Sequence, residues 1–199
     1  MDSHFFAYMY RLRYIERWSL MRNILKENVA EHSFHVALLT HVLCTIANEE
    51  FGRNVPTDRI VSMALFHDAT EVFTGDIPTP VKHHNPKILS NFRDIEQLAA
   101  ERLLDMIPPK LKPVYEPLID AKSSGLDPEL KRYVKAADLL DAYLKCVTEL
   151  SAGNKEFGSA KKQIEQSIQE MNMPEMEYFL KHMAPSLEKT LDELSEESL

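Results

Sequence analysis

Glycine is scarce in this sequence, and the sequence carries no signal for β-structure. Five glycines serve 199 residues, and none belongs to a Gly-rich phosphate-binding loop of either usual type. No two alternating segments are joined by a tight turn, so no β-hairpin is predicted. We also find no internal repeat and no low-complexity tract. These absences argue against nucleotide-binding folds built around a glycine loop and favour an all-α chain.

Cysteine and positive charge are also in short supply. The two cysteines, Cys44 and Cys146, fall inside apolar helical patterns, which is typical of buried free thiols in a reduced compartment. Lysine and arginine number 23 against 31 acidic residues, which gives a formal net charge of -8. A general nucleic-acid-binding protein needs a basic face to neutralise phosphates, so that class is disfavoured. A small phosphorylated ligand held by one or two local cations remains compatible with this charge.

Long apolar runs are missing as well. No stretch is expected to approach the ~20 apolar residues of a membrane span, and the N-terminus has no charged region followed by an apolar run. We therefore expect a cytoplasmic protein without membrane association. A length of 199 residues is typical of one domain with a substantial core. The prediction is a single domain over residues 1–199, in which the last helices and the acidic tail at 185–199 are peripheral.

Apolar residues repeat at intervals of three and four along most of the chain, which predicts helices. Asn28 and Glu31 form a capping signal at one helix start, and Asn85-Pro86 and Asp127-Pro128 mark two others. Ile95 and Leu98 are expected on the buried stripe of the helix at 85–107. Loops are predicted at 16–23, 74–80 and 122–126. The predicted helices are 3–15, 28–48, 57–68, 85–107, 110–119, 127–151, 155–170, 174–183 and 185–194.

His67 and Asp68 end an apolar run, and this pair is the sharpest chemical signal in the chain. Burying both groups is costly unless something pairs with them. A divalent metal ion would do so, because imidazole nitrogen and carboxylate oxygen are both metal ligands. At a helix end, where the backbone loosens, both side chains can converge on one ion. Glu71 lies four residues after His67, on the same face if the helix continues. An isolated His-Asp pair is more often a hydrogen-bonded surface pair, so the hypothesis needs partners elsewhere.

Two other helices offer those partners. His32 falls on the apolar face of the helix at 28–48, where a lone histidine is usually a satisfied core residue. It becomes a candidate ligand only because His67 and Asp68 need a further metal ligand. Asp138 lies on or near the apolar stripe of the helix at 127–151, close to Asp141. It either pairs with Lys135 or supplies a fourth metal ligand. Side chains on facing helices build such sites in helical bundles.

A local cluster of positive charge surrounds the only tryptophan. Arg17 could offer its guanidinium to a phosphate, although a charge cluster is usually a solvated face. Trp18 could be a core anchor or a flat wall beside a ligand. Asp76, in the loop after His67-Asp68, could be ordinary turn chemistry or could face the site. Residue types alone leave these alternatives open.

The chain resembles the HD-domain metal-dependent phosphohydrolase superfamily, whose ligand order is His, His-Asp, Asp. Within it, the similarity is to the bacterial 5′-deoxynucleotidase family, from about Ser3 into the last helix. The segments that carry it, in order, are Ser3–Ala7, Arg17-Trp18, Glu27–Ser33, His67–Val72, Thr74–Pro80 and Lys135–Asp138.

This resemblance implies a function and a set of site residues. The implied fold is a multi-helix HD-domain bundle around a central metal site, and the implied reaction is hydrolysis of deoxyribonucleoside 5′-monophosphates to deoxynucleoside and phosphate. Glu71 would serve catalysis, while Arg17, Trp18 and Asp76 would contact the substrate. A homodimer is implied too. The implied ligands of a divalent cation, such as cobalt or manganese, are His32, His67, Asp68 and Asp138.

Two other functions remain as alternatives. An HD-type phosphodiesterase or nucleoside-triphosphate hydrolase would often need more cations or a second metal with further histidines, and His83-His84 is the only spare pair. A non-catalytic, nucleotide-sensing helical regulator would keep the site without the reaction. The acidic Glu71 argues mildly against that regulator.

Overall fold

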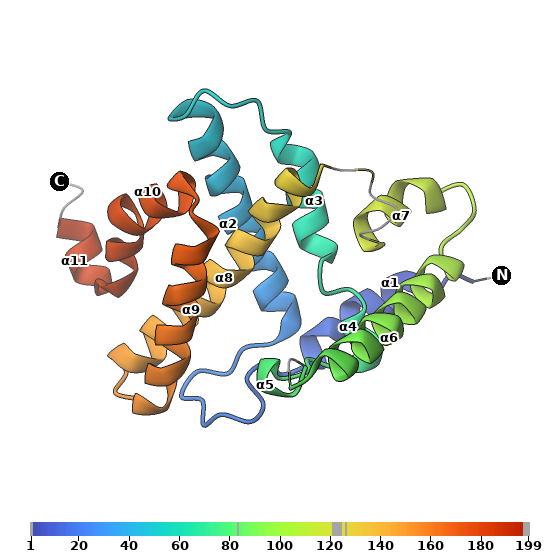
Figure 1. The fold of residues 1–199 in the computed structure, drawn as a ribbon, viewed down its shortest axis with the longest axis horizontal. Coiled ribbons are helices and arrows are strands. Elements are labelled where there is room, and N and C mark those ends of the chain that lie inside the picture. The colour runs from blue at the N-terminus through green and yellow to red at the C-terminus, as the bar shows by residue number, and fades with distance from the viewer. Residues whose placement is uncertain (1, 83, 121–124, 126, 197–199) are drawn as a thin grey trace.

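Helices form the fold throughout the part of the chain that this computed structural model describes, which is residues 2–82, 84–120, 125 and 127–196. Within those residues the one extended pairing is an isolated antiparallel bridge between Glu16 and Asn28, so the all-α prediction is confirmed. The elements (Figure 1) are α1 Phe5–Met9, η1 Tyr10–Tyr14, α2 Val29–Glu49, α3 Thr57–Phe66, α4 Glu71–Thr74, α5 Thr79–Lys82, α6 Pro86–Asp105, α7 Lys112–Ile119, α8 Pro128–Ser151, η2 Lys155–Phe157, α9 Gly158–Met171, α10 Pro174–His182, η3 Ala184–Glu188 and α11 Leu191–Glu196.

Helix α2 is the central element, and its start is fixed by the predicted cap. The Asn28 side chain accepts hydrogen bonds from the N–H groups of Ala30 and Glu31, and the Glu31 carboxylate accepts one from the N–H of Asn28. Such a cap contributes about 1 kcal/mol. Because the helix begins there, His32 lies one turn into α2 on the side that faces α8.

The main core lies between α2, α3, α8 and the C-terminal helices α9 and α10. Helix α2 packs against α3 and α8, and α8 packs against α9 (Figure 1). Burying each large apolar side chain contributes about 1.5–3 kcal/mol. The core side chains include Val36, Leu43, Ile60, Leu140 and Phe179. Three helices thus meet closely where the candidate residues lie.

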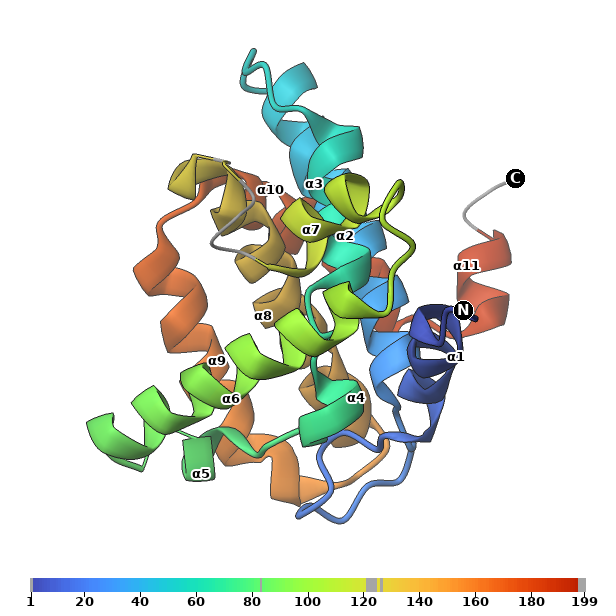
Figure 2. The ribbon, with the colours of Figure 1, turned by 90° about the vertical axis from the view of Figure 1, so that its right-hand side faces the viewer.

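A second, smaller core supports the other end of α3. It joins α1 to the turn after α3 and to α6 and α7, which lie together in Figure 2. Phe5 stacks beside Phe66 at 6.4 Å between ring centroids. This packing fixes the end of α3, and with it the turn that carries His67 and Asp68.

Several sequence-based boundaries need correction. Helix α5 begins at Thr79, inside the predicted loop 74–80. The predicted helix 185–194 is two pieces, η3 and α11, because residues around Lys189 adopt extended backbone. The predicted helix 3–15 tightens into a 3-10 turn at η1. Most of the predicted loop 122–126 lies outside the described residues.

The buried stripe predicted for α6 is wrong at two positions. Ile95 and Leu98 are 46% and 64% exposed. The stripe is buried as expected at Ala99 and Leu103, and Leu104 is also buried, near the end of the helix that meets the second core. Helix α6 therefore contacts the body mainly through its C-terminal half, and its period alone did not reveal this.

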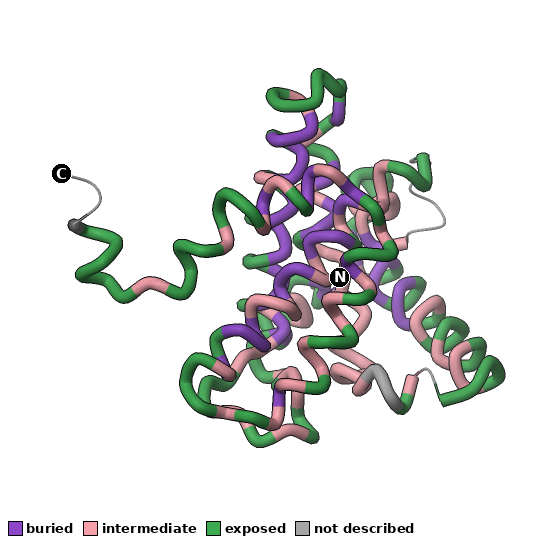
Figure 3. The backbone as a smooth tube through the Cα atoms, turned by 60° about the vertical axis from the view of Figure 1, so that its left-hand side comes forward, coloured by how far each residue is buried: buried purple, intermediate pink, exposed green. Residues whose placement is uncertain are grey.

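Helix α2 has the length and composition of a membrane span, contrary to the expectation for this chain. Its most apolar window has a mean hydropathy of 1.2. However, 56% of that window is buried inside the fold, and the buried stretches of the backbone, purple in Figure 3, lie within the body. These are properties of a core helix. The segment from η3 to α11, by contrast, extends away from the body and is mostly exposed (Figure 3).

Candidate metal centre

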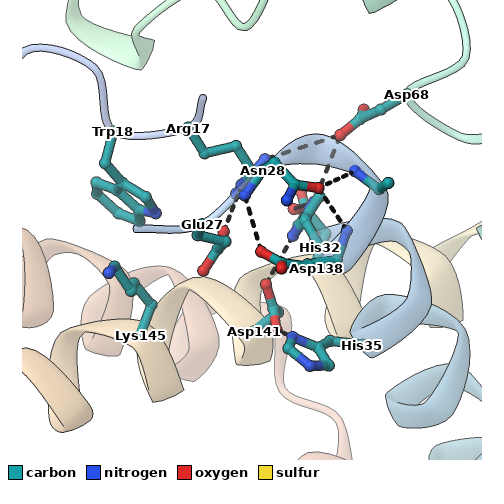
Figure 4. A network of polar contacts seen from close by, with 12 residues as sticks. Arg17, Trp18, Glu27, Asn28, His32, His35, Asp68, Asp138, Asp141 and Lys145 are labelled. Atoms are coloured by element: carbon teal, nitrogen blue, oxygen red, sulfur yellow. Dashed lines mark hydrogen bonds and ion pairs between the residues drawn. The ribbon is translucent and has the colours of Figure 1, made fainter. Parts of the chain in front are cut away.

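Four predicted residues reach one place from three parts of the fold, and Figure 4 labels three of them, His32, Asp68 and Asp138. His32 comes from the first turns of α2, and Asp138 comes from the middle of α8. His67 and Asp68 lie in the turn of residues 67–70 that separates α3 from α4. The loosened backbone of this turn lets adjacent side chains converge, as the sequence analysis expected of a helix end.

The distances define a cluster centred on His32. Its Nε2 atom lies 3.3 Å from Nε2 of His67, 3.4 Å from Oδ2 of Asp68 and 3.3 Å from Oδ1 of Asp138. The Nε2 atom of His67 lies 3.2 Å from Oδ2 of Asp68. Ligand atoms of His32, His67 and Asp68 all lie within 4.8 Å of one another, close enough to hold one ion. Asp138 is not in this group of three; its carboxylate faces His32, and its role as a metal ligand stays a prediction.

The outer nitrogens of both imidazoles already have partners. Nδ1 of His67 lies 2.7 Å from the carbonyl oxygen of Ala64, so it must be the protonated donor. Nδ1 of His32 lies 2.6 Å from Oδ2 of Asp141, which favours the same tautomer. In neutral rings both Nε2 atoms then carry lone pairs directed into the cluster. Protein metal sites hold their histidines in this way, so the residues present fit a metal ion.

The electrostatics also favour a bound cation. Burial lowers the pKa of His32, but hydrogen bonds to Asp138, Asp141 and Asp68 outweigh it and raise the pKa to about 11. Burial raises the pKa of Asp68, but His67 and His32 hold it well below its usual range. The carboxylates thus stay ionised, and a proton on His32 balances part of their negative charge. A divalent ion bound there would supply that positive charge and displace the proton.

Arg17 lies at the rim of the cluster (Figure 4). Its Nε atom donates to Oε1 of Glu27 at 2.7 Å, and its Nη1 atom lies 3.8 Å from Oδ2 of Asp68. Burial lowers the pKa of Arg17, but Glu27, Asp138 and other nearby carboxylates outweigh it and raise the pKa. A permanent guanidinium charge is therefore held next to the candidate metal ligands.

Glu71 and Asp76 lie near the cluster on the side of α4. Burial, followed by the charges of Asp68 and Asp76, raises the pKa of Glu71 to about 9. Its Oε2 atom is buried and has no hydrogen-bond partner. Gly75, whose φ of 71° favours glycine, ends α4 between the two acids. A buried acid with an unpartnered oxygen beside the ligands is suited to proton transfer.

Trp18 has a clear packing role. Its ring lies 5.4 Å from that of Phe157, and its backbone adopts a left-handed φ of 55°. The indole Nε1 atom is buried without a partner. The ring therefore packs against Phe157, and a ligand contact at Trp18 stays a prediction.

Two residues beside the cluster received no role from the sequence. Asp141 binds Nδ1 of His32, and Glu27 holds Arg17; both also lie with His32 in a second group of atoms that could hold a metal ion. The signal for Asp141 was its position three residues after Asp138, on the same side of a helix. Glu27 lies on a loop, where no period could reveal it. Of the spare histidines, His83 lies outside the described residues and His84 is exposed.

Comparison with solved structures gives the class of protein. A crystal structure of an HD-domain phosphohydrolase from Listeria innocua matches with a TM-score of 0.80 and 26% identity, and covers 94% of this chain and 90% of that chain. A predicted metal-dependent phosphohydrolase from Magnetospirillum magnetotacticum matches with a TM-score of 0.63 and 26% identity, over 92% of this chain and 87% of that one. The fold and the His/Asp cluster are those of an HD-domain phosphohydrolase.

Sequence comparison then gives the family. A model of the family described as 5'-deoxynucleotidase YfbR-like matches residues 4–187. The 5'-deoxynucleotidase YfbR of Shigella boydii is 48% identical over 197 residues, which are 99% of this chain and 98% of that protein. The chain belongs to the YfbR-like 5'-deoxynucleotidase family.

Proposed function

We propose that this protein is a metal-dependent 5′-deoxynucleotidase, a phosphoric monoester hydrolase of nucleotide metabolism that converts deoxyribonucleoside 5′-monophosphates to deoxynucleoside and phosphate. The observation that carries the proposal is the convergence of His32, His67 and Asp68 within 4.8 Å of one another, beside the guanidinium of Arg17. Family membership over nearly the whole chain supports the same reaction.

In this proposal a divalent cation, cobalt, manganese or a similar ion, binds His32, His67, Asp68 and Asp138. Two imidazoles and two carboxylates accept several first-row ions. When bound, the ion would polarise a phosphoryl oxygen and lower the pKa of bound water. The solved relative from Magnetospirillum magnetotacticum is a predicted metal-dependent phosphohydrolase. This supports a role for a metal ion and does not identify the element.

The remaining site residues would act on the substrate. Arg17 would bind the phosphate and offset its charge, a role that its 3.8 Å separation from Asp68 supports. Glu71 would orient or deprotonate the attacking water, or protonate the leaving 5′-oxygen. Its raised pKa supports a proton-transfer role. Phosphate-monoester hydrolysis is very slow without a catalyst, so these effects must act together.

Selection of deoxyribose would come from exclusion near Trp18 and Asp76. A tight wall there would leave no room for a 2′-hydroxyl, so AMP would bind less productively than dAMP. Equal hydrolysis of AMP and dAMP would overturn this part of the proposal and leave the phosphatase reaction intact.

One assay tests the function against its alternatives. The metal-loaded protein is incubated with dAMP, AMP, dATP and a cyclic nucleotide, and phosphate release is measured. Release from dAMP but not from dATP or the cyclic nucleotide is the expected result. Preference for dATP or the cyclic nucleotide would favour an HD-type triphosphate hydrolase or phosphodiesterase. Binding without release from any of the four would favour a nucleotide-sensing regulator.

The proposal includes a cytoplasmic homodimer that acts on free nucleotides, without a nucleic-acid polymer or a membrane as partner. Apolar side chains exposed on neighbouring elements support the dimer: Phe34 on α2 is 56% exposed, and Tyr14 on η1 is 71% exposed. Cys44 and Cys146 are buried and unpaired, as expected in a reducing compartment. Light scattering that gives the mass of one chain would contradict the dimer.

A further inference from the structure

We propose that Glu149, near the end of α8, is a positioning residue that fixes the loop of residues 16–27 so that Arg17 faces the candidate metal centre. This inference rests on the proposed function, because it assumes that Arg17 binds the substrate phosphate. The loop joins η1 to α2 and runs along the end of the molecule where α8, η2 and α9 meet (Figure 1).

The base of the 16–27 loop is closed by its own backbone. The N–H of Arg17 donates to the carbonyl oxygen of Glu27 at 3.0 Å, and the N–H of Val29 donates to the carbonyl oxygen of Ile15 at 3.0 Å. These bonds place Arg17 beside Glu27, where their side chains form the ion pair at 2.7 Å. The far end of the loop, at Ile24 and Leu25, takes its support from α8.

Glu149 binds that far end with both carboxylate oxygens. Oε2 accepts from the N–H of Ile24 at 3.0 Å and Oε1 accepts from the N–H of Leu25 at 3.0 Å. Oε1 also accepts from Nζ of Lys145 at 2.6 Å, and Oε2 accepts from Nδ2 of Asn154 at 2.7 Å. Lys145 donates in addition to the carbonyl oxygen of Leu25. The Glu149 side chain is 0% exposed, so a buried charge is fully satisfied by this one arrangement of the loop.

Apolar burial does not hold this part of the loop. Ile24 and Leu25 are 54% and 53% exposed, so their side chains point outward while their backbone N–H groups point at Glu149. Burial raises the pKa of Glu149, but hydrogen bonds from Lys145, Asn154 and the two N–H groups lower it to about 2. The carboxylate is therefore ionised at any working pH, and charge-assisted hydrogen bonds of this kind are the strong ones.

The same end of α8 also receives Trp18, the neighbour of Arg17. Trp18 packs on Phe157, and Nζ of Lys145 lies 5.6 Å from the centroid of the Phe157 ring (Figure 4 shows Lys145 beneath Trp18). The left-handed backbone of Trp18 is uncommon outside glycine and persists only where the surroundings enforce it. The carbonyl oxygen of Trp18 also accepts hydrogen bonds from the N–H of Met21 and from Nδ2 of Asn23. These bonds, Phe157 and the Glu149 contacts together hold the loop, so the orientation of Arg17 depends on them.

Two substitutions at Glu149 test the inference through a signal that lies on the loop itself. Trp18 is the only tryptophan, so its fluorescence reports the loop alone. In Glu149→Ala we expect red-shifted emission and stronger quenching by acrylamide, with Glu149→Gln intermediate. We expect KM for dAMP to rise by about 10-fold or more, because small misplacements of a substrate clamp are costly, with a smaller change in kcat and unchanged metal content. Glu165→Gln, which breaks the surface pair with Lys161, is the control with wild-type values.

A second variant guards against misfolding. Glu149→Ala leaves the charge of Lys145 buried, whereas the double variant Lys145→Met/Glu149→Met removes both charges at similar volume, a replacement that folded proteins often tolerate. A folded double variant with wild-type Trp18 emission and wild-type KM would overturn the inference. The emission needs no substrate, so the two proposals fail separately. A wild-type protein that releases no phosphate from dAMP overturns the proposed function, while the fluorescence alone still decides whether Glu149 fixes the loop.

Discussion

Nδ1 of His32 lies 2.6 Å from Oδ2 of Asp141, and both side chains are buried. The contact joins the first turns of α2 to the middle of α8 and directs the opposite nitrogen, Nε2, at His67 and Asp68. Oδ1 of Asp141 lies 3.5 Å from Nδ1 of His35, so the carboxylate is held from two sides. Asp141 therefore orients a candidate ligand without being required to touch the ion.

Asp141→Asn should weaken metal binding without abolishing it. Loss of a carboxylate partner of a metal-bound histidine typically costs 10–100-fold in metal affinity or activity. Titration of the metal-free protein with cobalt or manganese measures the change. Asp94→Asn, at an exposed carboxylate on α6, is the matched control and should bind as the wild type does. Equal affinity in Asp141→Asn and the control would show that the contact does not orient His32 for a metal.

His67→Ala should remove both the bound metal and the activity. The Nε2 atom of His67 is one of the two imidazole donors directed at the cluster, and the alanine leaves an incomplete ligand set. Metal content by elemental analysis and phosphate release from dAMP are the measurements. His41→Ala, at an exposed position on α2, should keep both. A His67→Ala protein that retains its full metal content would contradict the proposed ligands.

Both thiols should be unreactive in the folded protein. Burial raises the pKa of Cys44 to about 12 and that of Cys146 to about 11, and the thiolate is the reactive form. We expect no reaction with a thiol reagent at pH 8, and two equivalents after unfolding in guanidinium. Ser90→Cys, on the exposed side of α6, should add one fast-reacting thiol as a positive control. Rapid labelling of the wild type would contradict the burial of these residues.

The sequence predicted the helices with strong caps and the residues of the cluster, because both leave local marks. Asn28 and Glu31 cap α2 as expected, and the helix period then determines where His32 points. The turn after α3 also matched, since the His67-Asp68 pair is only compatible with burial where the backbone loosens.

What the sequence could not give was contact between segments far apart in the chain. Glu149 binds Ile24 and Leu25 across 125 and 124 residues, and no period or cap marks such a contact. The exposure of Ile95 and Leu98 has the same origin: a helical stripe shows which residues share a side, but the neighbouring element decides how much of that side is covered.

Glu71→Gln should lower kcat by about 10²–10⁴-fold, the usual contribution of a general acid or base, while the metal content stays unchanged. It should also stabilise the metal-free protein. The pKa of Glu71 is about 9 in the fold and ~4.3 in the unfolded chain, so the folded state binds more protons and loses stability as pH rises between these values. Glutamine removes that loss.

Thermal melts of the metal-free proteins at two pH values test the direction of this change in stability. We expect Glu71→Gln to melt above the wild type at pH 8, by about 2–4 °C for each ~1 kcal/mol relieved, and to match it near pH 4, where the wild-type acid is neutral. Glu101→Gln, at an exposed position on α6, should show no such difference. A Glu71→Gln protein that is less stable than the wild type at pH 8 would mean that the buried carboxylate is paired and stabilising, which would also remove the basis for its role in proton transfer.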